Sequence, residues 1–278
     1  MNYLIPRLEF AAQSLFRKQS HCPHCHSKNL NSIAKKYVVI NIKECNDCHL
    51  YFTDPIYKPL FVSNLYEQLY TAEGSTTCPP DSEELNNLID DSFRSSDKFF
   101  GERIRAIKSR CNGNKLLELG SSWGYFLYQA QQQEFDATGV EISQPRREFG
   151  ITNLKVNIVE NISQLDNDNF DLVYTAHTLE HFTDLSTIFQ EIHRVLKPKG
   201  QLLIEVPNFD FAELGKKVLP AVGAVHPLGF SNQFFQENLP KYGFKVLAFY
   251  DSWDGFPDLP VEKSSTGNII VLAEKTAD

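Results

Sequence analysis

The sequence lacks any apolar run that approaches the roughly 18 residues of a membrane-spanning helix. It also shows no internal repeat, no low-complexity tract and no secretory signal. We therefore expect a globular protein of the cytoplasm, where thiols stay reduced. A length of 278 residues suffices for one substantial core and a small appended module.

Positive charge is also scarce, and the formal net charge is −8. Residues 1–50 hold seven Lys and Arg against three Asp and Glu, whereas the rest of the chain holds 20 against 32. Proteins that grip nucleic acid neutralise backbone phosphates with clustered Lys and Arg. This balance therefore argues against nucleic acid as a partner and favours a small molecule.

Two Cys-x-x-Cys turns stand out in the first fifth of the sequence. They are CPHC and CNDC, separated by 19 residues, and they supply four candidate metal ligands: Cys22, Cys25, Cys45 and Cys48. Two such pairs are typical of a zinc ribbon, in which four thiolates close a tetrahedral and therefore structural site. The alternatives are disulfides, a redox pair, or a ligand set in which a neighbouring histidine replaces a cysteine: His24, His26 or His49. The intervening KKYVVINIKE alternates and is β-branched, which predicts a strand or hairpin.

Beyond the cysteines, strand-like and helix-like segments alternate. Residues 81–112 carry apolar side chains at helical spacing. Strands are predicted at 115–119, 137–141, 170–176 and 201–206, helices at 124–133 and 185–196, and two late β-rich runs at 245–250 and 268–275. Such alternation predicts an α/β fold with a doubly wound, Rossmann-like and mostly parallel sheet, preceded by the small N-terminal zinc-binding β module.

The turn ELGSSWG follows the first of these strands and opens a helix. Gly120 permits a sharp turn and Gly124 a close approach at the helix start. A dinucleotide-binding fingerprint would need a third glycine, which falls at Tyr125. Glu118, just before the turn, would repel a pyrophosphate and instead suits a ligand that carries positive charge. S-adenosylmethionine has a sulfonium, an ammonium and no phosphate, so it fits this turn.

Glu141 ends the second strand, 23 residues after Glu118. An acid at that place accepts hydrogen bonds from both ribose hydroxyls in such folds. The alternative is an ordinary acid at a strand end. Two acids at neighbouring strand ends make the Gly turn a stronger indication of a nucleoside-containing ligand than the turn is alone.

Several motifs resemble class I S-adenosylmethionine-dependent methyltransferases of the broad ubiquinone-type group. They lie between Lys115 and Asn208 and read ELGSSWG, GVEIS, NFDLVYTAHTLEHFTD, EIHRVLKPKG and LLIEVPN. The later HPLGFSNQFFQENLPKYGFKV is similar to the distal part of those domains. The chain departs from the pattern at Ser122 and Lys199, where the family more often has glycine. A zinc knuckle followed by YFTDP resembles a subset that acts on sugars and other small metabolites.

The resemblance implies a cofactor-binding role for a set of residues: Tyr70, Glu118, Gly120, Ser121, Ser122, Gly124, Glu141, Ile142, Asn161, Ile162, Thr175, Ala176 and His177. Of these, Gly120, Ser122 and Gly124 would face the methionine moiety. Glu141 would hold the ribose and Ile142 would contact the adenine. Tyr70 would cap the methionine carboxylate. The sequence is predicted to have three parts: residues 1–55 with the N-terminal segment and zinc-binding module, a helical connector or lid over 56–112, and the S-adenosylmethionine-binding methyltransferase domain over 113–278.

The resulting hypothesis is methyl transfer from S-adenosylmethionine to a small-molecule acceptor, such as a sugar or related metabolite. A hydroxyl or carbon acid as acceptor would need a base, for which His226 and His181 are the candidates; a helix-capping or structural role is the alternative for both. Ligands of open α/β sheets lie beyond the carboxyl ends of the strands. We therefore expect the acceptor pocket between the 209–235 insertion and the 50–80 connector. Two alternative functions are an RNA methyltransferase that uses the ribbon as an RNA grip, and a non-catalytic binding module.

Overall fold

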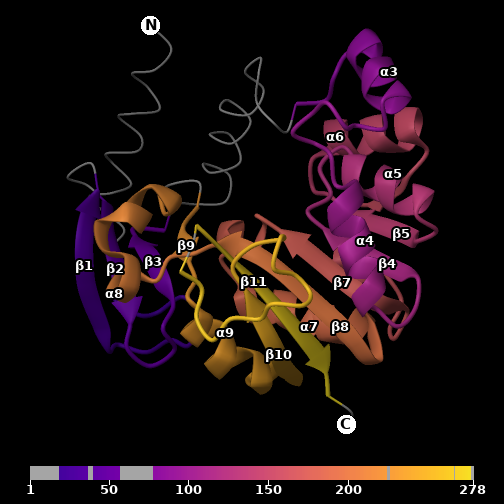
Figure 1. Cartoon of the computed structure of the whole chain (residues 1–278). Helices are drawn as coiled ribbons and strands as arrows, with labels where there is room; N and C mark the ends of the chain where they lie inside the picture. The colour runs from indigo at the N-terminus through magenta and orange to yellow at the C-terminus, as the bar shows by residue number, and fades with distance from the viewer. Residues whose placement is uncertain (1–18, 37–39, 57–77, 224–225, 266, 277–278) are drawn as a thin grey trace, which may run out of the picture.

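The computed structural model of the chain describes residues 19–36, 40–56, 78–223, 226–265 and 267–276. Within these ranges the strands form two sheets, one of seven strands and one of four (Figure 1). Tyr70 and most of the 50–80 connector lie outside the described residues, so the predictions made for them are not addressed. No helix in the described part is long and apolar enough to cross a membrane.

The larger sheet has the strand order β10-β11-β8-β7-β4-β5-β6. All neighbouring pairs from β8 to β6 are parallel, whereas β11 runs antiparallel to both β8 and β10. The bounds are β4 Lys115–Leu119, β5 Asp136–Val140, β6 Asn157–Val159, β7 Phe170–Ala176, β8 Leu196–Pro207, β10 Phe244–Tyr250 and β11 Asn268–Lys275. The predicted doubly wound, mostly parallel α/β sheet is therefore confirmed. Its order reverses between β4 and β7, the place where such sheets bind ligands.

Apolar side chains of the central strands alternate between two cores, because successive residues of a strand point to opposite faces. Leu116 belongs to the core that includes α4 and α5, and Leu117 to the core that includes α7 and α9. The helices are α3 Ser82–Asp90, α4 Gly101–Arg110, α5 Tyr125–Gln132, α6 Gln144–Phe149, α7 Leu185–Val195, α8 Phe211–Leu214 and α9 Asn232–Asn238. Short helical turns complete the fold: η1 Gly150–Leu154, η2 Ile162–Gln164, η3 Leu179–His181, η4 Gly215–Ala221 and η5 Leu239–Tyr242.

The helix predicted over residues 81–112 is wrong in its middle. Helix α3 ends at Asp90 and α4 begins at Gly101, and the chain between them turns with positive φ at Ser92 and Phe93. The break buries the Phe93 ring completely, in contact with Trp123 and Tyr128. Burial of an aromatic side chain against its own core thus outweighs the local helical pattern.

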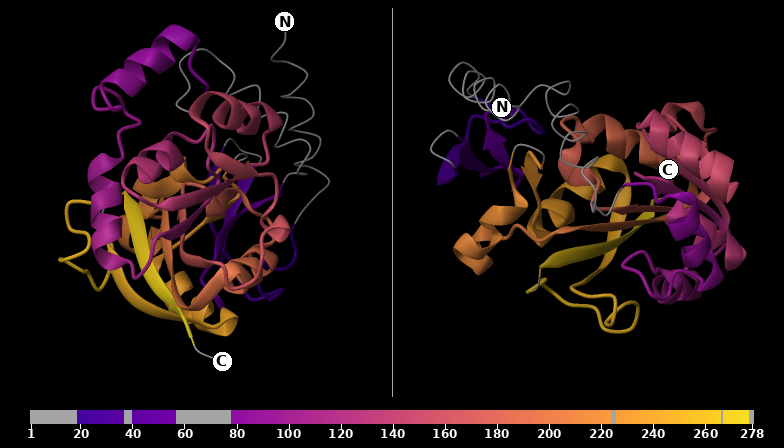
Figure 2. Two further views of the ribbon diagram at one scale, coloured as in Figure 1. Left: turned by 90° about the vertical axis from the view of Figure 1, so that its right-hand side faces the viewer. Right: turned by 90° about the horizontal axis from the view of Figure 1, so that it is seen from above.

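The smaller sheet has the order β1-β2-β3-β9 and is antiparallel throughout. Its first three strands come from the cysteine-containing segment: β1 Leu30–Lys36, β2 Ile40–Cys45 and β3 Tyr51–Asp54. The predicted hairpin between the two cysteine pairs is confirmed as β1 and β2. The fourth strand, β9 (Leu228–Gly229), comes from the 209–235 insertion. Figure 2 shows the indigo strands beside this orange segment, at the far end of the molecule from α3 to α6.

Candidate cofactor and metal sites

The turn between β4 and α5 depends on two glycines with left-handed backbone conformation. Gly120 has φ 84° and Gly124 has φ 86°. A Cβ atom at Gly120 would collide with the side chain of Thr178, and one at Gly124 with Val156. The backbone N–H groups of Gly120 and Ser121 donate to the carbonyl of Val140, at 2.9 and 3.0 Å. These bonds hold the turn directly against the carboxyl end of β5.

Glu141 follows β5 at this place and is buried. One carboxylate oxygen accepts the N–H of Ser122 at 2.9 Å, and the other accepts the N–H of Ser143 at 2.7 Å. A carboxylate has about four lone-pair directions, so these two bonds orient the group and leave acceptor capacity for a ligand. The arrangement fits the diol-binding role that the sequence predicted for Glu141.

Glu118, at the carboxyl end of β4, is a buried carboxylate with an unsatisfied atom. Only 8% of the residue is exposed, and its Oε2 has no hydrogen-bond partner among the described residues. Burial raises the pKa of this carboxyl well above its ordinary value, and the neighbouring charge of Glu141 raises it further. A buried acid without a partner is costly unless it is protonated or meets a positive charge. This position therefore suits a cationic ligand.

Three buried hydroxyls surround the same turn and find no hydrogen-bond partner within the described residues: Ser121, Ser122 and Thr175. Native proteins satisfy most buried polar atoms, so unsatisfied ones need an explanation. Here they lie at the carboxyl ends of β4 and β7, beside the switch in strand order. They lie at the same edge of the sheet as Glu118 and Glu141, and their unsatisfied hydroxyls are groups that a polar ligand such as S-adenosylmethionine would satisfy.

The other residues predicted for cofactor binding occupy the same edge of the sheet. Asn161 follows β6 and caps η2 by accepting the N–H of Ser163, and Ile162 is buried in the core. Ile142 is 79% exposed beside Glu141, an unusual position for a large apolar side chain. Ala176 ends β7 and His177 follows it with φ 50°. Their contacts with a cofactor stay predictions.

His177 connects two buried acids that sequence reasoning missed. Its backbone N–H donates to the carbonyl of Glu205, at 2.9 Å. Its ring nitrogens lie 3.7 Å from carboxylate oxygens of Glu180 and of Glu205. Burial alone would lower the pKa of His177, but the two acids outweigh it and raise that pKa to about 9.

Glu205 lies in β8, and its carboxylate accepts hydrogen bonds from other segments. Its carboxylate accepts hydrogen bonds from Arg103, Trp253 and Asn268, at 2.9, 2.9 and 3.1 Å. The Arg103 guanidinium also lies 4.6 Å from the Trp253 ring centroid. The signal available in the sequence was a lone acid inside the apolar run LLIEV, which a buried strand tolerates only when the acid is paired.

The two histidines proposed as bases lie together. The ring centroids of His181 in η3 and His226 in the insertion are 4.6 Å apart. The Nδ1 atom of His226 is 3.1 Å from the carbonyl oxygen of Ala221. Because η3 directly follows β7, the 209–235 insertion reaches the carboxyl edge of the sheet. This position agrees with the place predicted for the acceptor pocket, which stays a prediction.

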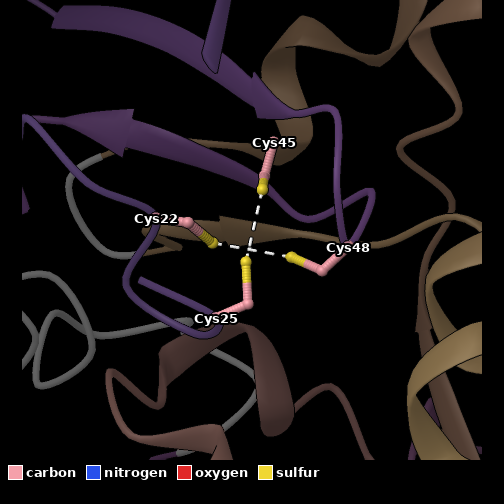
Figure 3. A group of neighbouring side chains, drawn as sticks. All are labelled: Cys22, Cys25, Cys45 and Cys48. Atoms are coloured by element: carbon pink, nitrogen blue, oxygen red, sulfur yellow. Dashed lines mark hydrogen bonds between the residues drawn. The ribbon is translucent and has the colours of Figure 1, made fainter. Parts of the chain in front are cut away.

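The four cysteines converge on one point, as Figure 3 shows. Their sulfur atoms all lie within 4.8 Å of one another, and the Sγ atoms of Cys22–Cys48 and Cys25–Cys45 are 3.5 Å apart. A tetrahedron with Zn–S bonds of about 2.3 Å has sulfur atoms about 3.8 Å apart. All four are free thiols in the structure, which disagrees with the disulfide alternative. Their geometry fits a closed tetrathiolate zinc site.

The ribbon, meaning residues 20–54 with the four cysteines, packs on the rest of the protein rather than standing apart. His24 in the first cysteine turn contacts the rings of Phe234 and Tyr242. The backbone N–H of Thr53 in β3 donates to the carbonyl of Pro227, at 2.9 Å. Cys22, Cys45 and Cys48 belong to the same apolar core as α7 and α9. The cysteine cluster is thus joined to the insertion that carries His226.

Comparison with known proteins places this geometry in a family. A family model described as "Methyltransferase domain" matches residues 92–248, more than half of the chain. Phosphoethanolamine N-methyltransferase 3 of Arabidopsis thaliana is 26% identical over 121 residues, which cover 38% of this chain and 25% of that protein. Glycine/sarcosine/dimethylglycine N-methyltransferase of Actinopolyspora halophila is 30% identical over 90 residues, or 32% of this chain and 16% of that protein. The chain thus matches a quarter or less of either relative.

A solved structure supports the same fold. The TehB-like S-adenosylmethionine-dependent methyltransferase of Corynebacterium glutamicum superposes with a TM-score of 0.51 at 18% identity, over 79% of this chain and all of that one. At this identity the likeness concerns the fold alone. The family match covers β4 to β8 with their Gly turn and strand-end acids. The chain belongs to the class I S-adenosylmethionine-dependent methyltransferases.

Proposed function

We propose that the protein transfers a methyl group from S-adenosylmethionine to a small polar acceptor, and that it carries a structural zinc ion in its ribbon. The observation that carries the proposal is the pair of strand-end acids. Glu141 is oriented by two backbone N–H groups, and Glu118 is buried with one carboxylate oxygen, Oε2, that has no hydrogen-bond partner among the described residues. One group suits a ribose diol and the other a positive charge, and S-adenosylmethionine has both.

The cofactor would supply an electrophilic methyl group, and the protein would position the acceptor in line with it. Gly120, Ser121, Ser122 and Gly124 would line the methionine side, with Thr175, Ala176 and His177 near the reacting end. Asn161, Ile162 and Ile142 would border the adenine. His181 or His226 would remove a proton from an acceptor that needs it. Tyr70 belongs to this proposal from its sequence position alone.

A small acceptor is favoured by charge and by similarity. Within the 209–235 insertion, Lys216 and Lys217 are the only cations and are balanced by Asp210 and Glu213. A groove for a phosphate backbone would need more positive charge. The two relatives have names that specify phosphoethanolamine and glycine derivatives as acceptors. An amine, sugar or related metabolite is thus the class we propose.

The ribbon would have a structural role in this function. Its four ligands close the coordination sphere, so no position is left for a substrate. A reducing compartment such as the cytoplasm would keep the thiolates available. The division at residues 55/56 and 112/113 stays a prediction, and the pairing of β3 with β9 joins the first part to the third.

The test is incorporation of a labelled methyl group. The purified protein is incubated with methyl-labelled S-adenosylmethionine and, separately, with a small-molecule extract or purified RNA. We expect label in the small-molecule fraction and none in RNA. Label in RNA would favour the alternative in which the ribbon grips RNA. Binding of S-adenosylhomocysteine without transfer to either fraction would favour a non-catalytic binding module.

A further inference from the structure

Three side chains of types that often bind metal ions lie close together at the carboxyl edge of the large sheet, outside the cysteine cluster. They are Glu180 and His181 in η3 and His226 in the insertion. One carboxylate oxygen and one nitrogen from each imidazole all lie within 4.8 Å of one another. In a closed coordination sphere with bonds of about 2.1 Å these atoms would be about 3.0–3.4 Å apart.

The carboxylate of Glu180 is the unusual member of the group. Only 1% of the residue is exposed, and neither oxygen has a hydrogen-bond partner among the described residues. The Nδ1 atom of His177 lies 3.7 Å from one of these oxygens, which is close enough for an ion pair but beyond normal hydrogen-bond length. A buried carboxylate is costly unless its oxygens accept hydrogen bonds or coordinate a metal, and the ion pair with His177 supplies neither. A cation between Glu180 and the two imidazoles would satisfy it.

His226 is already held in the orientation that a ligand needs. Its Nδ1 atom is 3.1 Å from the carbonyl oxygen of Ala221, an acceptor that requires a proton on Nδ1. The lone pair is then on Nε2. Metal-binding histidines almost always donate their other N–H to a carbonyl or carboxylate in this way. The backbone is held too, because the carbonyl of His226 accepts the N–H of Gly223 at 2.8 Å.

We propose that Glu180, His181 and His226 bind a divalent transition-metal ion such as Mn²⁺, Fe²⁺ or Zn²⁺. Two imidazoles and one carboxylate are typical ligands for these ions, and three protein ligands leave positions open for a further molecule. The site adjoins His177 at the end of β7, where the proposed function places the reacting end of the cofactor. The role of the metal rests on that function: it binds an oxygen or nitrogen of the acceptor and favours its deprotonated form. In the metal-bound protein this replaces removal of the proton by His181 or His226, because both imidazoles are then ligands.

Manganese distinguishes this site from the ribbon, since thiolates select zinc and a carboxylate with imidazoles accepts Mn²⁺. The full chain is dialysed against a mild chelator, its remaining zinc is counted by elemental analysis, and Mn²⁺ is titrated while electron paramagnetic resonance measures the free ion. We expect one tightly bound Mn²⁺ per chain, with water still bound to it as seen by proton relaxation. Glu180→Gln and His226→Ala should each weaken binding at least about tenfold.

The matched control is Glu148→Gln, because Glu148 is an exposed acid on α6. Its affinity for Mn²⁺ should equal that of the wild type. Melting temperature and binding of S-adenosylhomocysteine are measured for each variant, so that a misfolded protein is recognised. Absence of a tight Mn²⁺ site in the wild type, or a site unaffected in both folded variants, would overturn the proposal. If the wild type binds S-adenosylhomocysteine but no Mn²⁺, the metal site is wrong and the proposed function is unaffected. If it binds Mn²⁺ but no S-adenosylhomocysteine, the metal site is supported and the proposed function is contradicted.

Discussion

Asn238, at the end of α9, donates a hydrogen bond from Nδ2 to the backbone carbonyl of Cys48, at 2.9 Å. The two residues are 190 positions apart, and Asn238 is fully buried. The bond therefore joins the second cysteine turn to the methyltransferase body. With the contact between Thr53 and Pro227, it makes the proposed zinc site a support for the segment around His226.

We expect replacement of Asn238 to lower the free energy of unfolding, because the contact between α9 and the second cysteine turn is lost. Asn238→Ala leaves the buried carbonyl of Cys48 without its partner, which costs about 1–3 kcal/mol. The measurement is denaturant unfolding. Asn153→Ala is the control, because Asn153 makes a similar bond to a backbone carbonyl at the surface and should change stability by much less. Equal effects of both variants would mean that the hydrogen bond between Asn238 and Cys48 stabilises the protein no more than a surface hydrogen bond does.

Zinc content provides a direct test of the ribbon. Elemental analysis should give about one strongly held zinc ion per chain, and Cys45→Ser should lose it. Because β3 pairs with β9 just after His226, zinc loss should lower turnover more than it lowers affinity for S-adenosylhomocysteine. A native protein without metal, or one in which these cysteines form disulfides, would contradict the assignment.

Glu141 should contribute to the affinity for the cofactor by binding its ribose. Glu141→Ala removes two charge-assisted hydrogen bonds to the diol, and we expect affinity for S-adenosylhomocysteine to fall about 10- to 100-fold by calorimetry. The fold should remain intact. Glu148→Ala, on the neighbouring helix, is the control and should leave affinity unchanged. Unchanged affinity in Glu141→Ala would remove Glu141 from the site.

Glu118 should make stability depend on pH. Its native pKa is raised above the ordinary value of 4.5 because it is buried and lies near Glu141. Its contribution to stability is therefore complete below pH 4.5 and is lost as the pH rises through the native pKa. Glu118→Gln should raise the melting temperature at pH 8 relative to wild type, by about 2–4 °C for each kcal/mol, with a difference that shrinks toward pH 5.

The same variant should bind S-adenosylmethionine roughly tenfold more weakly or worse, since it lacks the negative charge for the cationic ligand. A variant that is more stable than the wild type but binds the cofactor more weakly would show that Glu118 increases affinity and decreases the stability of the fold. A variant that is destabilised at pH 8, or that binds the cofactor as well as the wild type, would show that Glu118 has another role.

His226 should affect turnover and not cofactor affinity. His226→Ala is expected to lower turnover by about 10²–10⁴, as for loss of a general base, and the proposed metal site would be lost with it. Affinity for S-adenosylhomocysteine should not change, because Glu118 and Glu141 belong to other segments, Glu118 to β4 and Glu141 to the turn after β5. Full turnover in this variant would leave His226 as a structural residue.

The class of fold, the family and the four residues of the cysteine cluster were all predictable from the sequence. They follow from short-range patterns: apolar strands, an amphipathic helix predicted at 185–196, and fixed spacings in CPHC, CNDC and ELGSSWG. Each rule depends on neighbours a few residues apart, and a strand-end acid such as Glu141 has its place as soon as the strand is recognised.

The contacts between distant segments could not be predicted in this way. Nothing in the local sequence pairs β3 with β9, joins Asn238 to Cys48, or places His226 beside Glu180, because these contacts depend on the packing of elements across the whole chain. Burial likewise broke the predicted helix at Phe93. Whether the carboxylate oxygens of Glu118 and Glu180 find hydrogen-bond partners depends on the groups around them. Folding brings those groups together from distant parts of the chain, so the local sequence does not predict them.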